Sequence, residues 1–151
     1  MSNHLKQARI AFATALVSGL CLSALPGTAL AQTASPAGVS TPGFQSKPLL
    51  VSPMSGNDQK EVVLVTATIA PGASSPRHTH PGDCYGTVVE GAIELHAEGK
   101  ETRRITVGEA FSNGRGTVHQ FVNVSDAPVR IVTTLLVDKD KPRTTFLPAS
   151  Q

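Results

Sequence analysis

The chain has 151 residues, 13 basic and 11 acidic side chains, and a formal net charge of +2 at pH 7. A charge this close to balance argues against nucleic acid or an anionic membrane as the partner. The hydrophobic fraction of 40% is enough for a core, and the length suits one domain.

The first 31 residues have the three-part pattern of a secretory signal. Lys6 and Arg9 form a short basic region, residues 10–25 are apolar, and residues 29–31 end the segment with a pattern that signal peptidase reads. The apolar run is shorter than the roughly 20 residues needed to span a bilayer, so we expect cleavage after Ala31 rather than a membrane anchor. We therefore expect an exported protein, periplasmic or secreted, without membrane contact after cleavage.

Cleavage would also change the charge and the cysteine content. Loss of Lys6 and Arg9 from the 13 basic residues leaves 11, which equals the 11 acidic residues. Cys21 would leave with the signal, so Cys84 would be the single thiol in an oxidising compartment and no internal disulfide could form. Burial or metal coordination would explain why Cys84 is tolerated there.

The rest of the chain has an all-β pattern between two irregular ends. Residues 32–56 are rich in Ser, Thr, Pro and Gly and are predicted to be a flexible tether, with an apolar patch at 49–51 that can add an edge strand. We expect one β-barrel domain over residues 57–140 and a solvated tail over 141–151. The expected strands are 61–70, 77–80, 84–90, 92–97, 102–107, 110–111, 118–124 and 129–137.

Three histidines and one cysteine are spaced so that they can meet in such a barrel. His78 and His80 point to the same side because side chains alternate across a strand, and His119 comes from a distant strand. Neutral imidazole is a ligand for Fe, Cu, Zn, Mn or Ni, so we predict one divalent transition metal ion at these three residues. Cys84 keeps the same parity, and it is interpreted either as a fourth ligand or as a small buried hydrophobic residue.

The same residues resemble the first motif of the cupin superfamily. That motif, G-x5-H-x-H-x3,4-E-x6-G, is matched in register by Gly72, His78, His80 and Gly91. Cys84 stands where the family has Glu. The exchange removes an anionic oxygen ligand, and it distinguishes this site from the three-His-one-Glu site of oxalate-degrading cupins.

The second cupin motif, G-x5-P-x-G-x2-H-x3-N, is matched by Gly108, Gly116, His119 and Asn123, with Gly114 in place of the Pro. The resemblance covers residues 61–137. It implies a small single-domain cupin with the fold of a double-stranded β-helix, or jelly-roll barrel, and a metal in one mouth of the barrel.

The missing Glu is also a feature of the thiol dioxygenases, which share this barrel and bind Fe(II) through three His. Some of them join a Cys at the position of Cys84 to a Tyr from elsewhere in the chain. The single Tyr here, Tyr85, is adjacent to Cys84 and is expected on the opposite face, so we predict no such cross-link.

Two functions follow as hypotheses. The first is a metal-dependent enzyme, dioxygenase-like or isomerase-like, that acts on a small molecule; the alternative is a non-catalytic protein that binds a metal or small ligand. Arg115 lies in a loop at the edge of the site and is a candidate for contacting an acidic substrate, whereas Arg77 is expected to point outward. No catalytic residue is identified. Pairing of the 49–51 edge predicts a homodimer.

Overall fold

The computed structural model describes residues 38–148. The predicted signal, residues 1–31, and the start of the predicted tether, residues 32–37, lie outside the described residues. Every helix or strand assigned within 38–148 is a β-strand, which confirms the all-β prediction. In this part of the chain there is accordingly no helix with the length and apolar character to cross a membrane.

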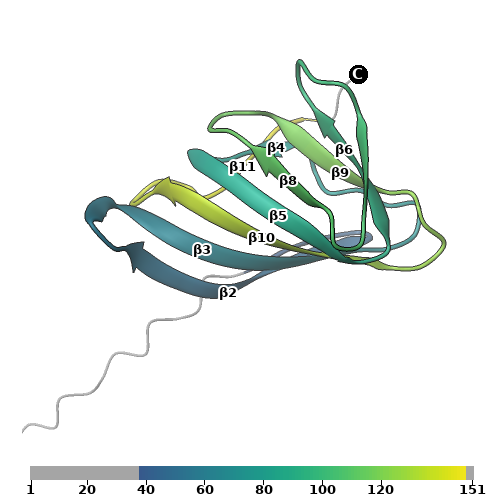
Figure 1. Cartoon of the computed structure of the whole chain (residues 1–151), viewed down its shortest axis with the longest axis horizontal. Coiled ribbons are helices and arrows are strands. Elements are labelled where there is room, and N and C mark those ends of the chain that lie inside the picture. The colour runs from purple at the N-terminus through teal and green to yellow at the C-terminus, as the bar shows by residue number, and fades with distance from the viewer. Residues whose placement is uncertain (1–37, 149–151) are drawn as a thin grey trace, which may run out of the picture. The chain divides into compact units, whose positions relative to one another are not determined.

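The described strands form two antiparallel sheets that face each other (Figure 1). The six-stranded sheet has the order β1 (Val39–Thr41), β2 (Phe44–Met54), β3 (Asn57–Ile69), β10 (Val129–Asp138), β5 (Gly82–Glu90) and β8 (Ala110–Asn113). The five-stranded sheet has the order β11 (Thr145–Phe146), β4 (His78–Thr79), β9 (His119–Asn123), β6 (Ala92–Ala97) and β7 (Arg103–Thr106).

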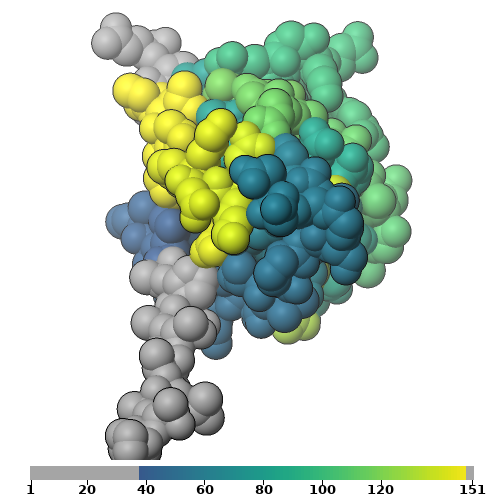
Figure 2. All heavy atoms as spheres, turned by 90° about the vertical axis from the view of Figure 1, so that its left-hand side faces the viewer, coloured from purple at the N-terminus to yellow at the C-terminus, as the bar shows by residue number. Residues whose placement is uncertain are grey.

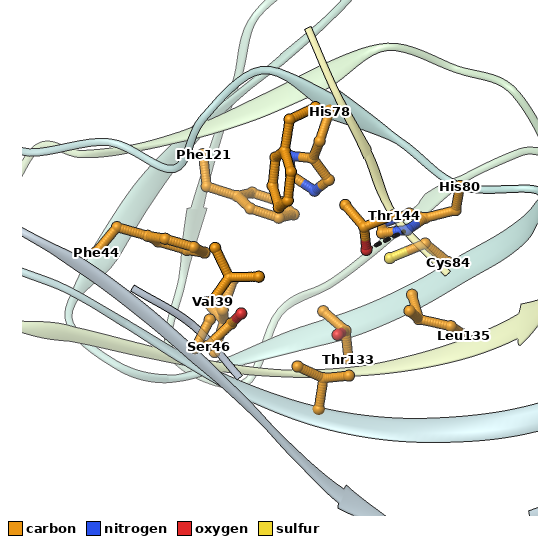
Figure 3. A pocket seen from close by; sticks show the side chains of 14 residues that line it. Val39, Phe44, Ser46, His78, His80, Cys84, Phe121, Thr133, Leu135 and Thr144 are labelled. Carbon is orange, nitrogen blue, oxygen red and sulfur yellow. Dashed lines mark hydrogen bonds between the residues drawn. The ribbon is translucent and has the colours of Figure 1, made fainter. Parts of the chain in front are cut away.

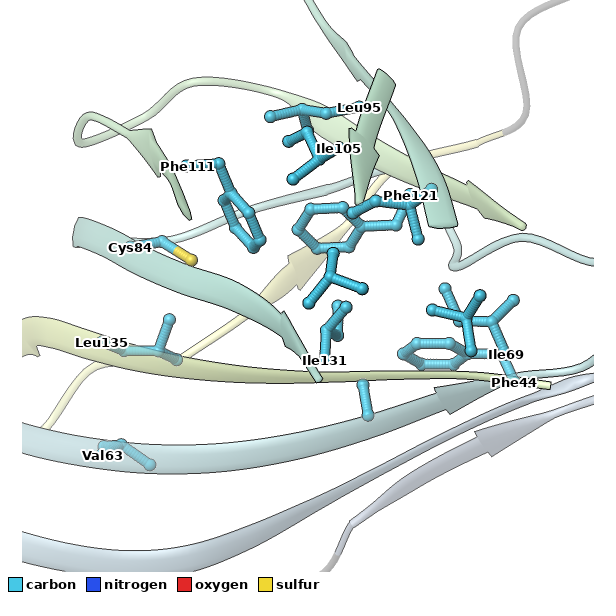
Figure 4. Close-up of a cluster of buried hydrophobic side chains, with 14 of the residues drawn as sticks. Phe44, Val63, Ile69, Cys84, Leu95, Ile105, Phe111, Phe121, Ile131 and Leu135 are labelled. Atoms are coloured by element: carbon cyan, nitrogen blue, oxygen red, sulfur yellow. The ribbon is translucent and has the colours of Figure 1, made fainter. Parts of the chain in front are cut away.

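The core lies between the two sheets because their inner faces are apolar. In β10 the buried residues alternate with less buried ones along the whole strand, as a half-buried strand requires. Ile131 and Leu135 of this strand point toward Phe111 and Phe121, whose ring centroids lie 5.0 Å apart (Figure 4). Full burial of each such side chain contributes about 1.5–3 kcal/mol.

The tether prediction is wrong for residues 38–56, except at the apolar patch 49–51, which was expected to add an edge strand and lies in β2. Strand β2 pairs with β3 from Phe44 to Met54, and Phe44 is buried in the core. The composition concealed this strand because Pro48 and Pro53 lie within it. Prolines are tolerated there because β1 pairs only with residues 44–46, so that the rest of β2 forms an edge of the sheet.

The predicted solvated tail also contains structure. Strand β11 pairs with β4, so that Phe146 lies opposite His78, and the backbone amide of Leu147 donates to the carbonyl of Arg77 at 2.9 Å. Figure 2 shows the C-terminal residues, in yellow, on the surface beside the blue residues of the β2–β3 region. The segment supplies backbone partners to β4, which would otherwise be an edge strand of its sheet.

Gly91 makes the tight connection between β5 and β6 that carries the chain from one sheet to the other. Its φ of 77° lies in the left-handed region, and a Cβ placed on it would lie 2.5 Å from Cγ2 of Val129. Only glycine fits both conditions. The last glycine of the first motif is therefore a requirement of the fold.

Candidate metal centre

The structure brings the three predicted histidines together. His78 of β4 lies directly opposite His119 of β9 in the strand register, and His80 follows β4 immediately. The ring centroids are separated by 4.2 Å for His78 and His119 and by 5.1 Å for His78 and His80. One nitrogen from each ring lies within 4.8 Å of the others, a spacing that a single metal ion can bridge.

Burial keeps these imidazoles uncharged. His78 and His80 are 7% exposed and His119 is 2% exposed. Burial, together with the neighbouring His119, lowers the pKa of His78 to about 3, and burial lowers the pKa of His119 to about 4. The pKa of His80 is lowered for the same reason. All three rings are therefore neutral at neutral pH, which is the form that binds metal ions.

Backbone carbonyls select the tautomer of each ring. Because a carbonyl oxygen only accepts hydrogen bonds, each Nδ1 must carry the proton and each Nε2 must carry the lone pair. The three Nδ1–O distances are 2.7 Å from His78 to Pro76, 2.8 Å from His80 to Arg143 and 3.0 Å from His119 to Thr117.

The Nε2 atom of His119 tests whether a metal fits this site. It is buried and has no hydrogen-bond partner in the described part of the chain. A buried unpartnered nitrogen costs about 1–3 kcal/mol. A metal ion would use this lone pair, and three neutral imidazoles are a suitable donor set for a divalent transition metal. The residues present therefore fit the ion that the sequence predicts.

Cys84 is not part of the group of converging donor atoms. Its side chain is 1% exposed, and it belongs to the hydrophobic core cluster while also lining the cavity beside the histidines (Figures 3 and 4). Burial raises the pKa of its thiol to about 12, so that the thiol is neutral. These apolar surroundings favour the interpretation of Cys84 as a small buried hydrophobic residue. Tyr85 is 48% exposed and lies on the opposite face, as expected.

Arg115 is not brought into the site. Its Nη1 and Nη2 atoms each donate to a carboxylate oxygen of Asp138 at 2.8 Å, and Asp138 also pairs with Lys60 and Lys141. The guanidinium is committed to this surface cluster because a bidentate pair with a carboxylate matches its geometry. Arg77 likewise pairs with Glu98 and does not line the cavity beside the histidines.

An inner cavity of about 70 Å³ adjoins His78 and His80 (Figure 3). Its wall is mainly apolar and includes Phe121, and the hydroxyl groups on it belong to Ser46, Thr133 and Thr144. None of the described residues that line it is Lys, Arg, Asp or Glu. A wider groove of about 530 Å³ shares lining residues with the cavity and contains the charged groups, namely Glu61, Lys139, Asp140, Lys141 and Arg143.

Sequence reasoning missed the C-terminal residues that support the site. Arg143 provides the carbonyl that orients His80, and its guanidinium pairs with Glu61, where Nη2 lies 3.2 Å from Oε2. The hydroxyl of Thr144 lies 3.3 Å from Nδ1 of His80. The short run of β-branched and aromatic residues at 144–146 was the one hint of a strand there.

Comparisons with known proteins agree with this architecture. Residues 65–136 match the family model of the cupin domain. The HTH-type transcriptional regulator PuuR of Escherichia coli strain K12 is 30% identical over 79 residues, which are 52% of this chain and 42% of the regulator. The chain therefore spans less than half the length of the curated relative that it matches.

Solved structures provide the remaining comparisons. An oxalate oxidase in complex with the substrate analogue glycolate is 27% identical, with a TM-score of 0.59 over 72% of this chain and 57% of the oxidase. KdgF from Halomonas sp. is 28% identical, with a TM-score of 0.54 over 69% of this chain and 89% of KdgF. A double-stranded β-helix protein from Klebsiella pneumoniae, 20% identical with a TM-score of 0.60 over 74% of this chain and 90% of that protein, shares the fold. With the two facing sheets and the converging histidines, the family-model match shows that residues 65–136 of this chain form a cupin domain.

Proposed function

We propose that this cupin is a metal-dependent enzyme that acts on a small molecule and holds one divalent transition metal through His78, His80 and His119. The observation that carries the proposal is the set of carbonyl contacts to the three Nδ1 atoms, because it leaves every Nε2 lone pair available for the metal. The adjoining cavity of about 70 Å³ supports a small substrate. Oxalate oxidase, one of the structural neighbours, was solved with the substrate analogue glycolate, which is a small molecule.

The donor set limits the chemistry. A bound metal would supply Lewis-acid polarisation of a coordinated oxygen. The three imidazoles are neutral, the Cys84 thiol is neutral, and no carboxylate lines the described cavity, so the protein does not compensate the charge of the ion there. This favours a substrate that brings an anionic oxygen, and we expect dioxygenation or isomerisation of such a molecule.

A non-catalytic binding protein is the second candidate. Apart from the histidines that would hold the metal, the described cavity wall offers no group that transfers protons near neutral pH, because the pKa of Cys84 is about 12. A site that binds without turnover would have this composition. Activity measurements must therefore separate binding from catalysis.

Two measurements test the proposal. Elemental analysis of protein purified from its native host should find close to one transition metal ion per chain, and His119→Ala should lose it. Oxygen uptake by the Fe(II)-loaded protein, measured with a panel of thiols, diketones and phenols, and product analysis under nitrogen should then find turnover that His119→Ala lacks. Metal binding without turnover in either assay would favour the binding protein. Absence of metal would refute the metal-dependent enzyme and would leave only a protein that binds a small ligand.

Export is a further part of the proposal, and the signal pattern of residues 1–31 supports it. Amino-terminal sequencing of the protein from a periplasmic or secreted fraction should begin at Gln32. An intact amino terminus in the cytoplasmic fraction would refute export. The absence of a nucleic-acid partner remains a prediction.

A homodimer is also proposed, through the edge formed by β2. Leu49 and Leu50 are 52% and 53% exposed there, and apolar side chains on a sheet edge favour association. Sedimentation velocity should give a dimer that Leu50→Lys converts to a monomer. A monomeric native chain would refute this arrangement.

A further inference from the structure

A second buried polar side chain near the histidines is not used by the fold. Asn113, the last residue of β8, is 1% exposed, and neither its Nδ2 nor its Oδ1 has a hydrogen-bond partner within residues 38–148. Buried amide groups are almost always partnered, and leaving one unpartnered costs about 1–3 kcal/mol. Such a group is typical of a site that binds a ligand.

The strand register places this amide beside Cys84, a residue of the cavity wall, and Asn113 itself lies behind that wall rather than in it. Asn113 lies directly opposite Cys84 in the pairing of β8 with β5, and residues in that relation point to the same face with Cβ atoms about 4.5–5.5 Å apart. Cys84 lines the cavity together with His78 and His80. Phe111, two residues before Asn113 and on the same face, packs inside the barrel against Phe121. Asn113 therefore faces inward at the histidine end of the barrel.

The chemistry of the amide defines its ligand. A carboxamide presents a donor and an acceptor side by side, so a ligand that satisfies both must carry an acceptor beside a donor. The uncompensated charge of a metal held by neutral imidazoles favours an anionic oxygen in the same ligand. An α-hydroxy acid combines these features, because its carboxylate accepts and its hydroxyl donates.

We propose that Asn113 is a ligand-binding residue, whose Nδ2 donates to the carboxylate and whose Oδ1 accepts from the hydroxyl of a small α-hydroxy acid held at the three histidines. The inference rests on the proposed metal centre and adds the substrate class to it. The cavity of about 70 Å³ restricts the ligand to a small member of that class.

The chain contains a matched control in Asn123, which is equally buried, at 2% exposed. Its Nδ2 donates to the carbonyls of Ile69 and Ala127, both at 2.9 Å, and its Oδ1 accepts from the backbone amide of Ser125 at 2.8 Å. Replacing Asn123 by Leu removes bonds that hold the fold, whereas replacing Asn113 by Leu removes none that the described chain makes.

The first test compares Asn113→Leu with Asn123→Leu in the metal-free full-length protein. We expect the melting temperature of N113L to equal or exceed that of the native protein, and that of N123L to fall. A loss of stability in N113L as large as that in N123L would show that the amide is structural, and would overturn the proposal.

The second test measures ligand binding to the Co(II)-loaded protein by calorimetry and by the visible spectrum of the ion. The probes are glycolate, acetate, which lacks the hydroxyl, and hydroxyacetone, which lacks the charge. We expect the native protein to prefer glycolate to both. In N113L glycolate affinity should fall about tenfold, as the loss of about 1.4 kcal/mol of hydrogen bonding predicts, and the preference over acetate should shrink.

Each remaining outcome has a defined meaning. Unchanged glycolate affinity in N113L, or no glycolate binding by the Co(II)-loaded native protein, overturns the role of Asn113 and leaves the metal centre intact. Failure of the native protein to bind Co(II) refutes the metal centre and this inference together. If N113L does not fold, Asn113→Asp preserves the volume of the side chain. The carboxylate of this variant should weaken the binding of glycolate more than the binding of hydroxyacetone. Equal effects on the affinities for the two probes would contradict the proposal.

Discussion

The two ends of strand β9 place polar side chains on the same inner face but use them in opposite ways. Asn123, at one end, has backbone partners for both its amide nitrogen and its amide oxygen. His119, at the other end, has its Nδ1 bonded to Thr117 and its Nε2 without a partner in the described chain. Both residues are almost completely buried, so exposure does not distinguish them.

Hydrogen bonding therefore distinguishes the two ends of this strand. At the Asn123 end the polar atoms join β3, β9 and the turn at 123–127. At the histidine end the polar atoms of His119 and Asn113 keep hydrogen-bonding capacity that the fold does not use. Both His119 and Asn123 belong to the second cupin motif, although only one of them is a metal-ligand candidate.

The largest expected effect is on metal binding. His119→Ala removes one of the three proposed ligands and should lower the affinity for Zn(II) or Co(II) by more than about 100-fold, because binding of the ion by the remaining two imidazoles is weak. Asn123→Ala should leave the affinity within about threefold, since Asn123 lies outside the donor group. Competition titration with a chromophoric chelator measures both. Equal losses of metal affinity in the two variants would contradict the assignment of different roles to the two ends of β9.

The same pair should reverse its order when stability is measured without metal. Asn123→Ala should lower the free energy of unfolding by about 2–4 kcal/mol, because it leaves buried carbonyl and amide groups without partners. His119→Ala should lower it by less, since it removes only the hydrogen bond from Nδ1 to Thr117, while the Nε2 atom contributes none. Urea denaturation followed by circular dichroism measures the difference. A greater loss in His119→Ala would contradict the assignment of the structural role to Asn123.

The histidine end should also make the metal-free protein sensitive to acid. In the folded state the pKa of His78 is lowered from 6.5 to about 3 and that of His119 to about 4, so the unfolded chain binds more protons between about pH 6.5 and pH 4. The stability contributed by the neutral rings is complete above pH 6.5 and is lost as the pH falls through that window. Unfolding at pH 7 and pH 5 should show this loss, and His119→Gln should reduce it. A stability that is constant over the window would contradict the lowered pKa values.

The C-terminal support of His80 gives a smaller effect. Glu61→Gln weakens the pair with Arg143, whose carbonyl orients His80, and should lower metal affinity about tenfold, as loss of a supporting contact does. Glu90→Gln is the matched control. It breaks the more exposed pair with Arg130 and should change nothing measurable. Metal titration measures the affinity of both variants. Recovery of metal affinity in Glu61→Asp would show that the ion pair acts by positioning Arg143.

The smallest effect is expected at Cys84. Because the thiol lies outside the donor group, Cys84→Ser should change metal affinity by less than about threefold, while the buried hydroxyl lowers stability by about 1–3 kcal/mol. The visible spectrum of the Co(II) form reports ligation directly, because thiolate ligands add an intense charge-transfer band. Loss of such a band on substitution would establish Cys84 as a ligand.

The local patterns of the sequence were sufficient for the strands within residues 61–137 and for the three histidines. Alternation along residues 129–137 and the spacing of His78, His80 and His119 depend on neighbours in the chain, and the structure agrees with them. The composition of residues 32–56, rich in Ser, Thr, Pro and Gly, predicted a tether with an edge strand at 49–51 only. The full strand 44–54 depends on its pairing with β3, which local composition does not express. Arg115 was predicted near the site because of the loop that contains it. Its ion pair with Asp138 joins residues far apart in the chain, so no local pattern could predict it.

The sequence by itself determined most of the strands and the three converging histidines, because periodicity and motif spacing express which side chains share a face. Only the tertiary structure decided which polar groups are free to bind. The pairing of Asn113 with Cys84, the support of His80 by Arg143 and the full bonding of Asn123 join residues that are distant in the chain or related by a turn. Hydrogen-bond partners depend on distance and direction in space, so the use of each buried polar atom becomes visible only when the strands are in register.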